Sequence, residues 1–399
     1  MAEERETLLR VEHLCQYFKM GPSSELKAVD DVSFDIKKGE VFGLVGESGC
    51  GKTTTGRTII KLYNATSGNV WFKDRRIVSG TRSYKDEIKE LSAKKRQGGD
   101  NAAIDARIAE LRAEIKRAKH DQKRCDKDYE AEQVARLKEE LSQKLAAETD
   151  EGAKKALQAE YKKKIRIAAK TRLVTQIQMI FQDPIASLDP RMTIRDIIAE
   201  GLIIQGHKDQ AYIDEAVYQV LEMVGLVREH AGRYPHEFSG GQRQRVGIAR
   251  SIVMKPDLII ADEPISALDV SIQAQVINLL NDLRNQLGLT ILFIAHDLSV
   301  VKYFSDRIGV MYFGKLVELA SSDELFKHPF HPYTKSLLSA IPLPDPHYEK
   351  QRKRITYNPI AEHDYSKEAP TLREVCPGHF VRCNSEELKR YQDLLKNEQ

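Results

Sequence analysis

The sequence contains no long apolar run. No stretch approaches the roughly 20 consecutive apolar residues that a helix needs to cross a bilayer, and the chain begins with charged residues rather than an apolar leader. Cysteine is scarce, and its five copies are too scattered to form a disulfide framework. These absences predict a soluble, cytoplasmic protein with reduced thiols. The formal net charge of +3 is nearly balanced, so composition gives no reason to expect wholesale nucleic-acid binding.

A glycine-rich stretch at residues 46–53 matches the phosphate-loop pattern G-x-x-x-x-G-K-[ST]. The apolar run 41–45 before it predicts a buried strand, and residues 54–61 can open a helix, so bound phosphates would meet a helix N-terminus. In such a loop the backbone N–H groups surround the phosphates and the lysine adds a positive charge. The residues predicted to hold the phosphates are Gly46, Ser48, Gly49, Cys50, Gly51, Lys52, Thr53 and Thr54.

Two carboxylates follow a second apolar run, residues 258–261. Polar groups at the carboxyl ends of buried parallel strands lie where ligands bind in α/β folds. We expect the hydroxyl of Thr53 and the carboxylate of Asp262 to hold a magnesium ion or its waters. The next residue, Glu263, is predicted to polarise the attacking water. An isolated Asp-Glu pair would usually be a solvated turn, but the preceding strand favours a site.

Three further features are weak signals when taken alone. Gln182 and His296 each follow an apolar run, and a single polar residue at a strand end is usually an ordinary hydrogen-bonded side chain. Residues 238–242 contain a Gly-Gly step, which permits close approach of the backbone to a phosphate when it begins a helix. Their order along the chain, relative to the glycine-rich stretch and the Asp-Glu pair, makes a functional interpretation of these features stronger.

An insertion at residues 82–172 differs sharply in composition from the rest of the chain. It is rich in Lys, Glu, Ala, Arg and Gln, and its isoleucines 104, 108 and 115 and leucine 111 recur at helical spacing. We predict a charged, coiled-coil-like helical hairpin, or a three-helix arm, that projects from the body. A solvated elaboration without a function and a docking arm for a partner both fit this pattern.

In this order the motifs resemble those of the ATP-binding cassette (ABC) family, over nearly the whole chain outside the insertion. The resemblance implies an α/β fold, namely a P-loop NTPase cassette with a RecA-like core, an antiparallel β subdomain and a helical subdomain that carries the signature at 238–242. It identifies Gln182 as the Q-loop glutamine, a further magnesium ligand, His296 as the switch histidine and Asp269 as the D-loop aspartate. The catalytic residues that it implies are Lys52, Gln182, Glu263 and His296.

By the same resemblance, two cassettes clamp two ATP molecules between them, with Mg²⁺ as the metal cofactor. The signature residues of one cassette would meet the γ-phosphate that lies on Lys52 of the other. These signature residues are Ser239, Gly240, Gly241 and Gln242. The aromatic side chain that stacks on adenine is matched best by Phe18, with Tyr17 as the alternative.

Residues 328–334 resemble the C-terminal extension on ATPase subunits of oligopeptide and dipeptide importers, a branch that also contains nickel importers. The chain looks most like the second of the two ATPases in such systems. The implied division is a cassette at 1–325, interrupted by the insertion at 82–172, and an extension at 326–399. The implied partners are a second ATPase subunit, identical or different, two integral membrane permeases and, indirectly, an external substrate-binding protein. This places the chain on the cytoplasmic face of the membrane as a peripheral subunit, with no nucleic acid expected.

Two alternatives and one departure accompany this interpretation. A soluble cassette ATPase of DNA repair or chromosome maintenance also carries a coiled-coil arm, but there the arm follows the Q-loop, whereas here it precedes Gln182. For His328 and His331, capping and packing around prolines are favoured over metal binding, because no further ligands follow at ligand spacing. Many members of the branch ligate an iron–sulfur cluster in the extension, whereas Cys376 and Cys383 are too few, so we predict no cluster.

Overall fold

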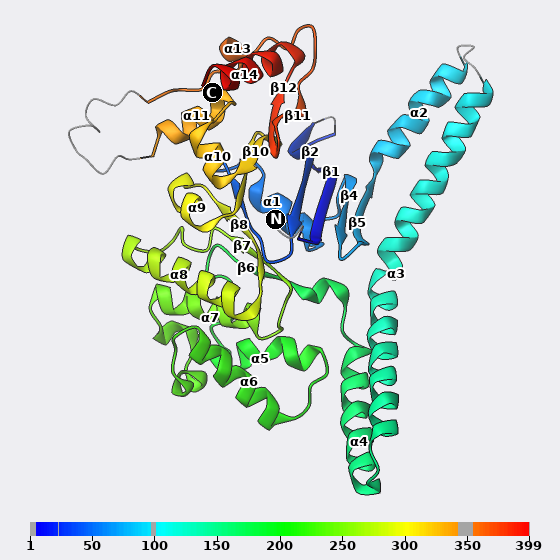
Figure 1. Cartoon of the computed structure of the whole chain (residues 1–399), viewed down its shortest axis with the longest axis vertical. Coiled ribbons are helices and arrows are strands. Elements are labelled where there is room, and N and C mark those ends of the chain that lie inside the picture. The colour runs from blue at the N-terminus through cyan, green and yellow to red at the C-terminus, as the bar shows by residue number, and fades with distance from the viewer. Residues whose placement is uncertain (1–4, 23, 97–100, 342–353, 399) are drawn as a thin grey trace.

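The apolar runs of the sequence form the centre of an eight-stranded sheet (Figure 1). The computed structural model describes residues 5–22, 24–96, 101–341 and 354–398. The strand order is β11-β12-β10-β9-β3-β8-β7-β6, and the inner strands are parallel. The predicted buried strands are confirmed; the parallel strands are β3 (Val41–Val45), β6 (Ile177–Ile180), β7 (Leu258–Asp262), β8 (Thr290–Ala295) and β9 (Arg307–Tyr312).

Side chains alternate between two cores, one on each face of this sheet. Ile259 and Ile291 point into one core, and their neighbours Leu258 and Leu292 point into the other. The first core is covered by helices from the C-terminal half of the cassette and by the helical subdomain. These elements are α5 (Ile194–Ile204), α6 (Gln210–Met223), η2 (Arg228–Gly232), η3 (Pro235–Glu237), α7 (Gly240–Ile252), α8 (Val270–Leu287) and α9 (Leu298–Phe304).

The second core lies between the main sheet and a four-stranded antiparallel sheet of order β2-β1-β4-β5. Helix α1 (Lys52–Ile59) contacts β1, β2 and β7 and so belongs to this layer. The strands are β1 (Thr7–Lys19), β2 (Glu25–Lys37), β4 (Ser67–Phe72) and β5 (Arg75–Thr81). The cassette expected from the sequence, with its core, β subdomain and helical subdomain, is therefore confirmed.

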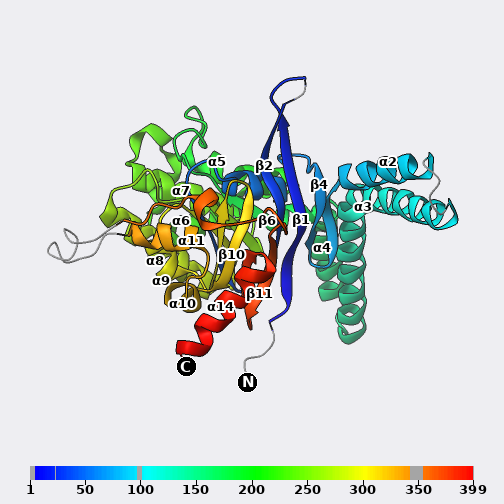
Figure 2. The same cartoon turned by 90° about the horizontal axis from the view of Figure 1, so that it is seen from above.

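The insertion forms three helices, α2 (Arg82–Arg96), α3 (Asn101–Ala147) and α4 (Glu151–Ala168), followed by η1 (Leu173–Gln176). Helix α3 has 47 residues and is about 70 Å long at 1.5 Å per residue. Its middle is fixed to the cassette, since Cys125 and Tyr129 join the second core and Glu114 pairs with Arg76 of β5 at 2.8 Å. The arm therefore lies along the side of the antiparallel sheet; its α2 end projects sideways from the body, and its α4 end reaches below the helical subdomain in the view of Figure 1 (Figures 1 and 2).

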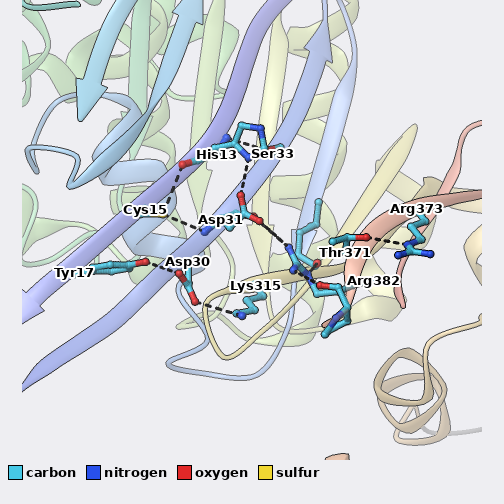
Figure 3. Close-up of polar contacts among 12 residues, drawn as sticks. His13, Cys15, Tyr17, Asp30, Asp31, Ser33, Lys315, Thr371, Arg373 and Arg382 are labelled. Atoms are coloured by element: carbon cyan, nitrogen blue, oxygen red, sulfur yellow. Dashed lines mark hydrogen bonds and ion pairs between the residues drawn. The ribbon is translucent and has the colours of Figure 1, made fainter. Parts of the chain in front are cut away.

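The C-terminal extension continues the main sheet beyond β10 (Lys315–Ser321). Strand β12 pairs antiparallel with β10 and β11, and Arg382 of β12 donates to the backbone oxygens of Leu316 and Asp31. Figure 3 shows how Arg382 reaches β2, beside the Tyr17–Asp30–Lys315 chain of polar contacts. The remaining elements are α10 (Ser322–Lys327), α11 (Pro332–Ser339), α13 (Pro359–Glu362), β11 (Thr371–Cys376), β12 (His379–Cys383) and α14 (Ser385–Glu398). Within the residues described, no helix has both the length and the apolar character needed to cross a bilayer.

Candidate functional site

The glycine-rich loop lies between β3 and α1, as its sequence context predicts. Gly51 has φ 106° and caps α1, and a Cβ there would meet the backbone oxygen of Ala28 at 2.1 Å. Gly46 has φ 151°, and a Cβ there would meet the backbone oxygen of Met311 at 2.2 Å. Nζ of Lys52 donates to the backbone oxygens of Gly46 at 2.7 Å and Glu47 at 2.9 Å. The backbone therefore holds a tight concave loop with a lysine ammonium beside it, which suits polyphosphate binding.

The pair predicted to hold a metal ion is assembled next to this loop. Oγ1 of Thr53 donates to Oδ1 of Asp262 at 2.7 Å, although these residues belong to α1 and β7. Asp262 is fully buried, and burial raises the pKa of its carboxyl. Its second oxygen, Oδ2, is buried and makes no hydrogen bond within the described part of the chain, and the guanidinium of Arg57 lies 4.0 Å away. A hydroxyl beside an incompletely bonded carboxylate is the hard oxygen donor set that suits Mg²⁺.

The ends of three neighbouring strands bring together the side chains that were weak signals in the sequence. Nε2 of Gln182, after β6, donates to Oε2 of Glu263 at 3.0 Å. Nδ1 of His296, after β8, lies 3.3 Å from the same oxygen. Glu263, after β7, adopts φ 44°, a left-handed conformation that non-glycine residues rarely occupy, and its N–H donates to Ile294 at 2.9 Å. Three strands thus hold one carboxylate in a defined position, as a water-orienting base requires.

The signature residues form the N-terminus of helix α7. Ser239 caps α7 and exchanges two hydrogen bonds with Gln242, so this glutamine is occupied within its own helix. The hydroxyl of Ser239 and the amides of Gly240 and Gly241 remain at the tip. Among the described residues, no hydrogen bond or ion pair joins this tip to the glycine-rich loop. Asp269 is the N-cap residue of the next helix, α8, and in the described structure its side chain makes no capping hydrogen bond.

The two aromatic candidates for adenine stacking are in different surroundings. Tyr17 donates to Asp30, and Lys27 and Arg82 lie over its ring at 5.3 and 5.8 Å. Burial raises its pKa, so the hydroxyl stays protonated. Phe18 packs edge-on against Tyr63, just after α1, with the ring centroids 5.3 Å apart. Because neighbouring residues of a strand point to opposite faces, only Phe18 is directed toward the helix that follows the loop. The geometry favours Phe18, and its role in stacking stays a prediction.

Sequence analysis missed one residue that contacts the loop. The backbone N–H of Glu47 donates to the hydroxyl of Tyr333 at 3.0 Å, so the C-terminal extension touches the glycine-rich loop directly. Tyr333 is 2% exposed and packs on Tyr312 with the ring centroids 4.4 Å apart. The stretch 328–334 indicated an extension, but no local pattern could reveal a contact between residues so distant in sequence.

The Tyr333→Phe substitution should weaken ATP binding by about two- to tenfold, which is the net worth of one hydrogen bond. It leaves the Glu47 amide without its partner and keeps the ring in place. Equilibrium titration with an ATP analogue measures the change. Tyr391→Phe is the matched control, because Tyr391 is equally buried in the extension and its hydroxyl makes no hydrogen bond to any residue that the structure describes. Equal affinities of the two variants would contradict a positioning role for Tyr333.

Comparison with known proteins agrees with this geometry. A sequence profile described as "ABC transporter" matches residues 29–150 and 143–266, and one described as "Oligopeptide/dipeptide transporter, C-terminal region" matches residues 317–383. The chain is 49% identical over 387 residues to the oligopeptide transport ATP-binding protein OppF of Bacillus subtilis, covering 97% of this chain and 99% of that one. It is 42% identical over 392 residues to the dipeptide transport ATP-binding protein DppF of Lactococcus lactis, covering 98% of each.

Solved structures share the fold at lower identity. One is cbiO1 of Clostridium perfringens, part of an ABC transporter complex, with 21% identity, a TM-score of 0.51 and coverage of 81% of this chain and 91% of that chain. Another is a dimeric ATP-binding cassette in a post-hydrolysis state, bound to ADP and phosphate. It has 21% identity and a TM-score of 0.51, and covers 79% of this chain and 99% of that chain.

Proposed function

Because this chain belongs to the ABC transporter family, whose members hydrolyse ATP, we propose that it is the ATPase subunit of a membrane importer of oligopeptides or dipeptides. The observation that carries the proposal is the combination of a glycine-rich loop and adjacent carboxylates with a C-terminal extension of the oligopeptide/dipeptide type, matched at residues 317–383. The alternative of a DNA-repair or chromosome-maintenance ATPase is not supported, since the similar proteins are peptide-transport ATPases over nearly their whole length.

Each side chain of the site has a proposed task. Residues 46–54 cradle the phosphates of ATP, with Lys52 supplying positive charge. Thr53 and Asp262 would hold Mg²⁺, with Gln182 as a further ligand; when bound, the ion neutralises charge on the β- and γ-phosphates. Glu263 orients and polarises the attacking water, and His296 holds the Glu263 carboxylate in place.

Closure of two cassettes on ATP supplies the missing part of the site. Ser239, Gly240 and Gly241 lie at a helix N-terminus, which favours an anion, and among the described residues no hydrogen bond or ion pair joins them to the phosphate loop of their own chain. A second ATPase subunit, identical or different, would meet them with the γ-phosphate held on its own lysine. Hydrolysis then releases the clamp, and the opening and closing drive two membrane permeases. The external binding protein that delivers peptide to the permeases is an indirect partner.

The proposed location follows from these partners. The chain would lie on the cytoplasmic face of the membrane, bound to the permeases. In this arrangement residues 1–325 act as the cassette, interrupted at 82–172, and residues 326–399 as the extension that contacts the phosphate loop through Tyr333.

Reconstitution tests the proposal. The chain is co-expressed with a candidate second ATPase and two permeases, and uptake of labelled peptides of two to eight residues into vesicles is followed with and without ATP. ATP-dependent uptake that requires this chain is expected. ATP hydrolysis that responds to duplex DNA, together with no retention by permeases, would refute the transport assignment.

The outer end of the arm can be removed without exposing the core. The hydroxyl of Tyr161 lies 3.4 Å from Oε2 of Glu140, so replacing residues 141–160 with a short Gly/Ser linker joins two neighbouring points. The contacts of Tyr129 and of Glu132 with the cassette are kept. ATP hydrolysis should change by less than about twofold, as expected for a surface change remote from the site. A larger loss, measured with the same nucleotide assay, would contradict this.

The same variant distinguishes the two interpretations of the arm. If permeases still co-purify and uptake is unchanged, this end of the arm is a solvated elaboration. If permeases are lost while hydrolysis persists, it is a docking element. A charge-neutral surface change on α4, Lys164→Gln with Glu160→Gln, removes an exposed ion pair without shortening the arm and serves as the control.

A further inference from the structure

The C-terminal extension contains a group of metal-ligand side chains that takes no part in the ATP site. Glu324 of α10, Cys376 at the end of β11 and His379 at the start of β12 place a carboxylate oxygen, Sγ and Nδ1 within 4.8 Å of one another. Oε1 of Glu324 is 4.0 Å from Sγ of Cys376 and 3.6 Å from Nδ1 of His379. Ligands on a tetrahedral zinc ion, bonded at about 2.0–2.3 Å, lie about 3.5 Å apart, so small side-chain shifts would accommodate an ion.

His379 is oriented as a metal-binding histidine is. Its side chain is fully buried, and Nε2 lies 2.9 Å from Oε1 of Glu318, which is also fully buried. Glu318 further accepts the backbone N–H groups of Phe330 at 2.7 Å and His331 at 3.2 Å, as an ionised carboxylate does. This network assigns the ring proton to Nε2 and leaves the lone pair of Nδ1 facing Glu324 and Cys376. A carboxylate behind a histidine is the usual outer partner of a metal ligand.

The Nδ1 atom of His379, which faces Glu324 and Cys376, has no other polar partner among the described residues. Nδ1 of His379 is buried and makes no hydrogen bond to any described residue. A buried polar atom without a partner is costly and needs a reason, and a metal ion would supply one. We propose that Glu324, Cys376 and His379 bind a divalent transition metal ion of the zinc class.

The ligand chemistry selects the ion. A thiolate, an imidazole and a carboxylate suit Zn²⁺ or Co²⁺, whereas Mg²⁺ prefers oxygen ligands alone. His328, whose Nδ1 lies 3.0 Å from Oε1 of Glu324, is placed to become a fourth ligand. Glu324 lies four residues before His328 in the sequence, and the fold brings Cys376 and His379 to them from the β11–β12 hairpin. The site uses a single sulfur and so differs from a cluster held by several cysteines.

A metal ion could reach this site from solvent, and its binding would stabilise the extension. A cavity of about 660 Å³ is lined by Glu324, His328 and Cys376 and is open to solvent. Binding would link α10, next to the cassette sheet, to the β11–β12 hairpin. A ligand that binds the folded state alone raises thermal stability, so the metal-loaded protein should melt at a higher temperature than the metal-free protein.

The experiment uses the full-length protein, stripped with a chelator and kept free of nucleotide and Mg²⁺. Zn²⁺ or Co²⁺ alone is titrated in, and bound metal is counted by elemental mass spectrometry. We expect one ion per chain, with Co²⁺ giving tetrahedral d–d bands and a thiolate charge-transfer band. Cys376→Ser should weaken Zn²⁺ binding by more than about 100-fold, because losing a direct ligand costs more affinity than losing a residue that only hydrogen-bonds a ligand. The same substitution should abolish the charge-transfer band. Cys383→Ser, in the same hairpin but outside the group, is the matched control and should keep both.

A second measurement does not depend on how the variant folds. In the wild-type protein, bound Zn²⁺ should protect Cys376 from alkylation by iodoacetamide, and chelation should restore the reaction, as read from the peptide mass. The proposal is overturned if neither ion binds, if Cys376→Ser binds as tightly as the wild type, or if protection is absent. Iron with acid-labile sulfide in anaerobically purified protein would also overturn it in favour of a cluster.

Discussion

ATP hydrolysis should fall by about 10²–10⁴-fold in the Glu263→Gln variant, the usual contribution of a water-orienting base. The amide has the shape of the carboxylate and can still accept the hydrogen bond from Gln182, so the loop and the metal pair keep their geometry. What is lost is the negative charge that polarises water. ATP affinity should therefore stay near the parental value, and ATP-bound dimers should accumulate because the step that opens them is blocked. Steady-state hydrolysis, equilibrium ATP binding and light scattering measure the three quantities.

Glu222→Gln provides the control for this variant. Its carboxylate pairs with Arg228 on the surface of α6, so the substitution removes the same charge far from the three strand ends. Hydrolysis should stay within about twofold of the parent, since exposed substitutions change free energies by about 0.5 kcal/mol or less. A parental rate in Glu263→Gln itself would show that another residue activates the water.

The Gly240→Asp variant should lose ATP-dependent dimerisation and hydrolysis by about 10²–10³-fold, because two like charges brought together across an interface cost several kcal/mol. The fold should tolerate the change. A Cβ at Gly240 meets only Cδ2 of Leu268, at 3.7 Å, which is an ordinary contact. An aspartate in the first turn of α7 even complements the helix dipole. The melting temperature should thus be unchanged or slightly higher, while the γ-phosphate of the other subunit's ATP is repelled.

The Gly240→Asp result distinguishes an ATP site shared between two subunits from an ATP site formed by one chain alone. ATP binding to the isolated subunit should be unaffected, since the glycine-rich loop of the same chain is intact. Gly232→Asp is the matched control, because a Cβ there meets nothing within 4 Å and the same charge is added to the same subdomain. Normal dimerisation of Gly240→Asp, measured by size-exclusion chromatography with ATP, would remove the support for the clamp.

The sequence predicted those parts of the fold and site that are encoded locally. The apolar runs before Asp262 and His296 became parallel strands, because a strand buried on both faces needs such a run. The glycines at 46 and 51 were predicted as loop residues, and their close backbone contacts explain why. Once several strands were predicted, the meeting of Gln182, Glu263 and His296 at one sheet edge followed from the topology of parallel sheets.

Contacts between distant segments could not be predicted in this way. The hydrogen bond from Glu47 to Tyr333 depends on how the extension folds back over the cassette. The sequence predicts an arm that projects from the body, and the structure adds that Cys125 and Tyr129 anchor its long helix to the cassette. The helical spacing of its isoleucines and leucine predicts a helix, but it does not indicate the surface against which that helix packs. The pairing of Glu318 with His379 likewise requires two strands that lie far apart in the sequence.

The hairpin that continues the main sheet also protects its edge. Without β11 and β12, strand β10 would expose unpaired N–H and C=O groups along its outer side, and such an edge invites strand addition from another molecule and aggregation. The new edge, β11, is short and carries Arg373 and Glu374, whose charges oppose further pairing. A chain truncated before Thr371 would therefore have an exposed edge strand that can pair with other molecules. The extension thus limits aggregation of the cassette, in addition to contacting its glycine-rich loop.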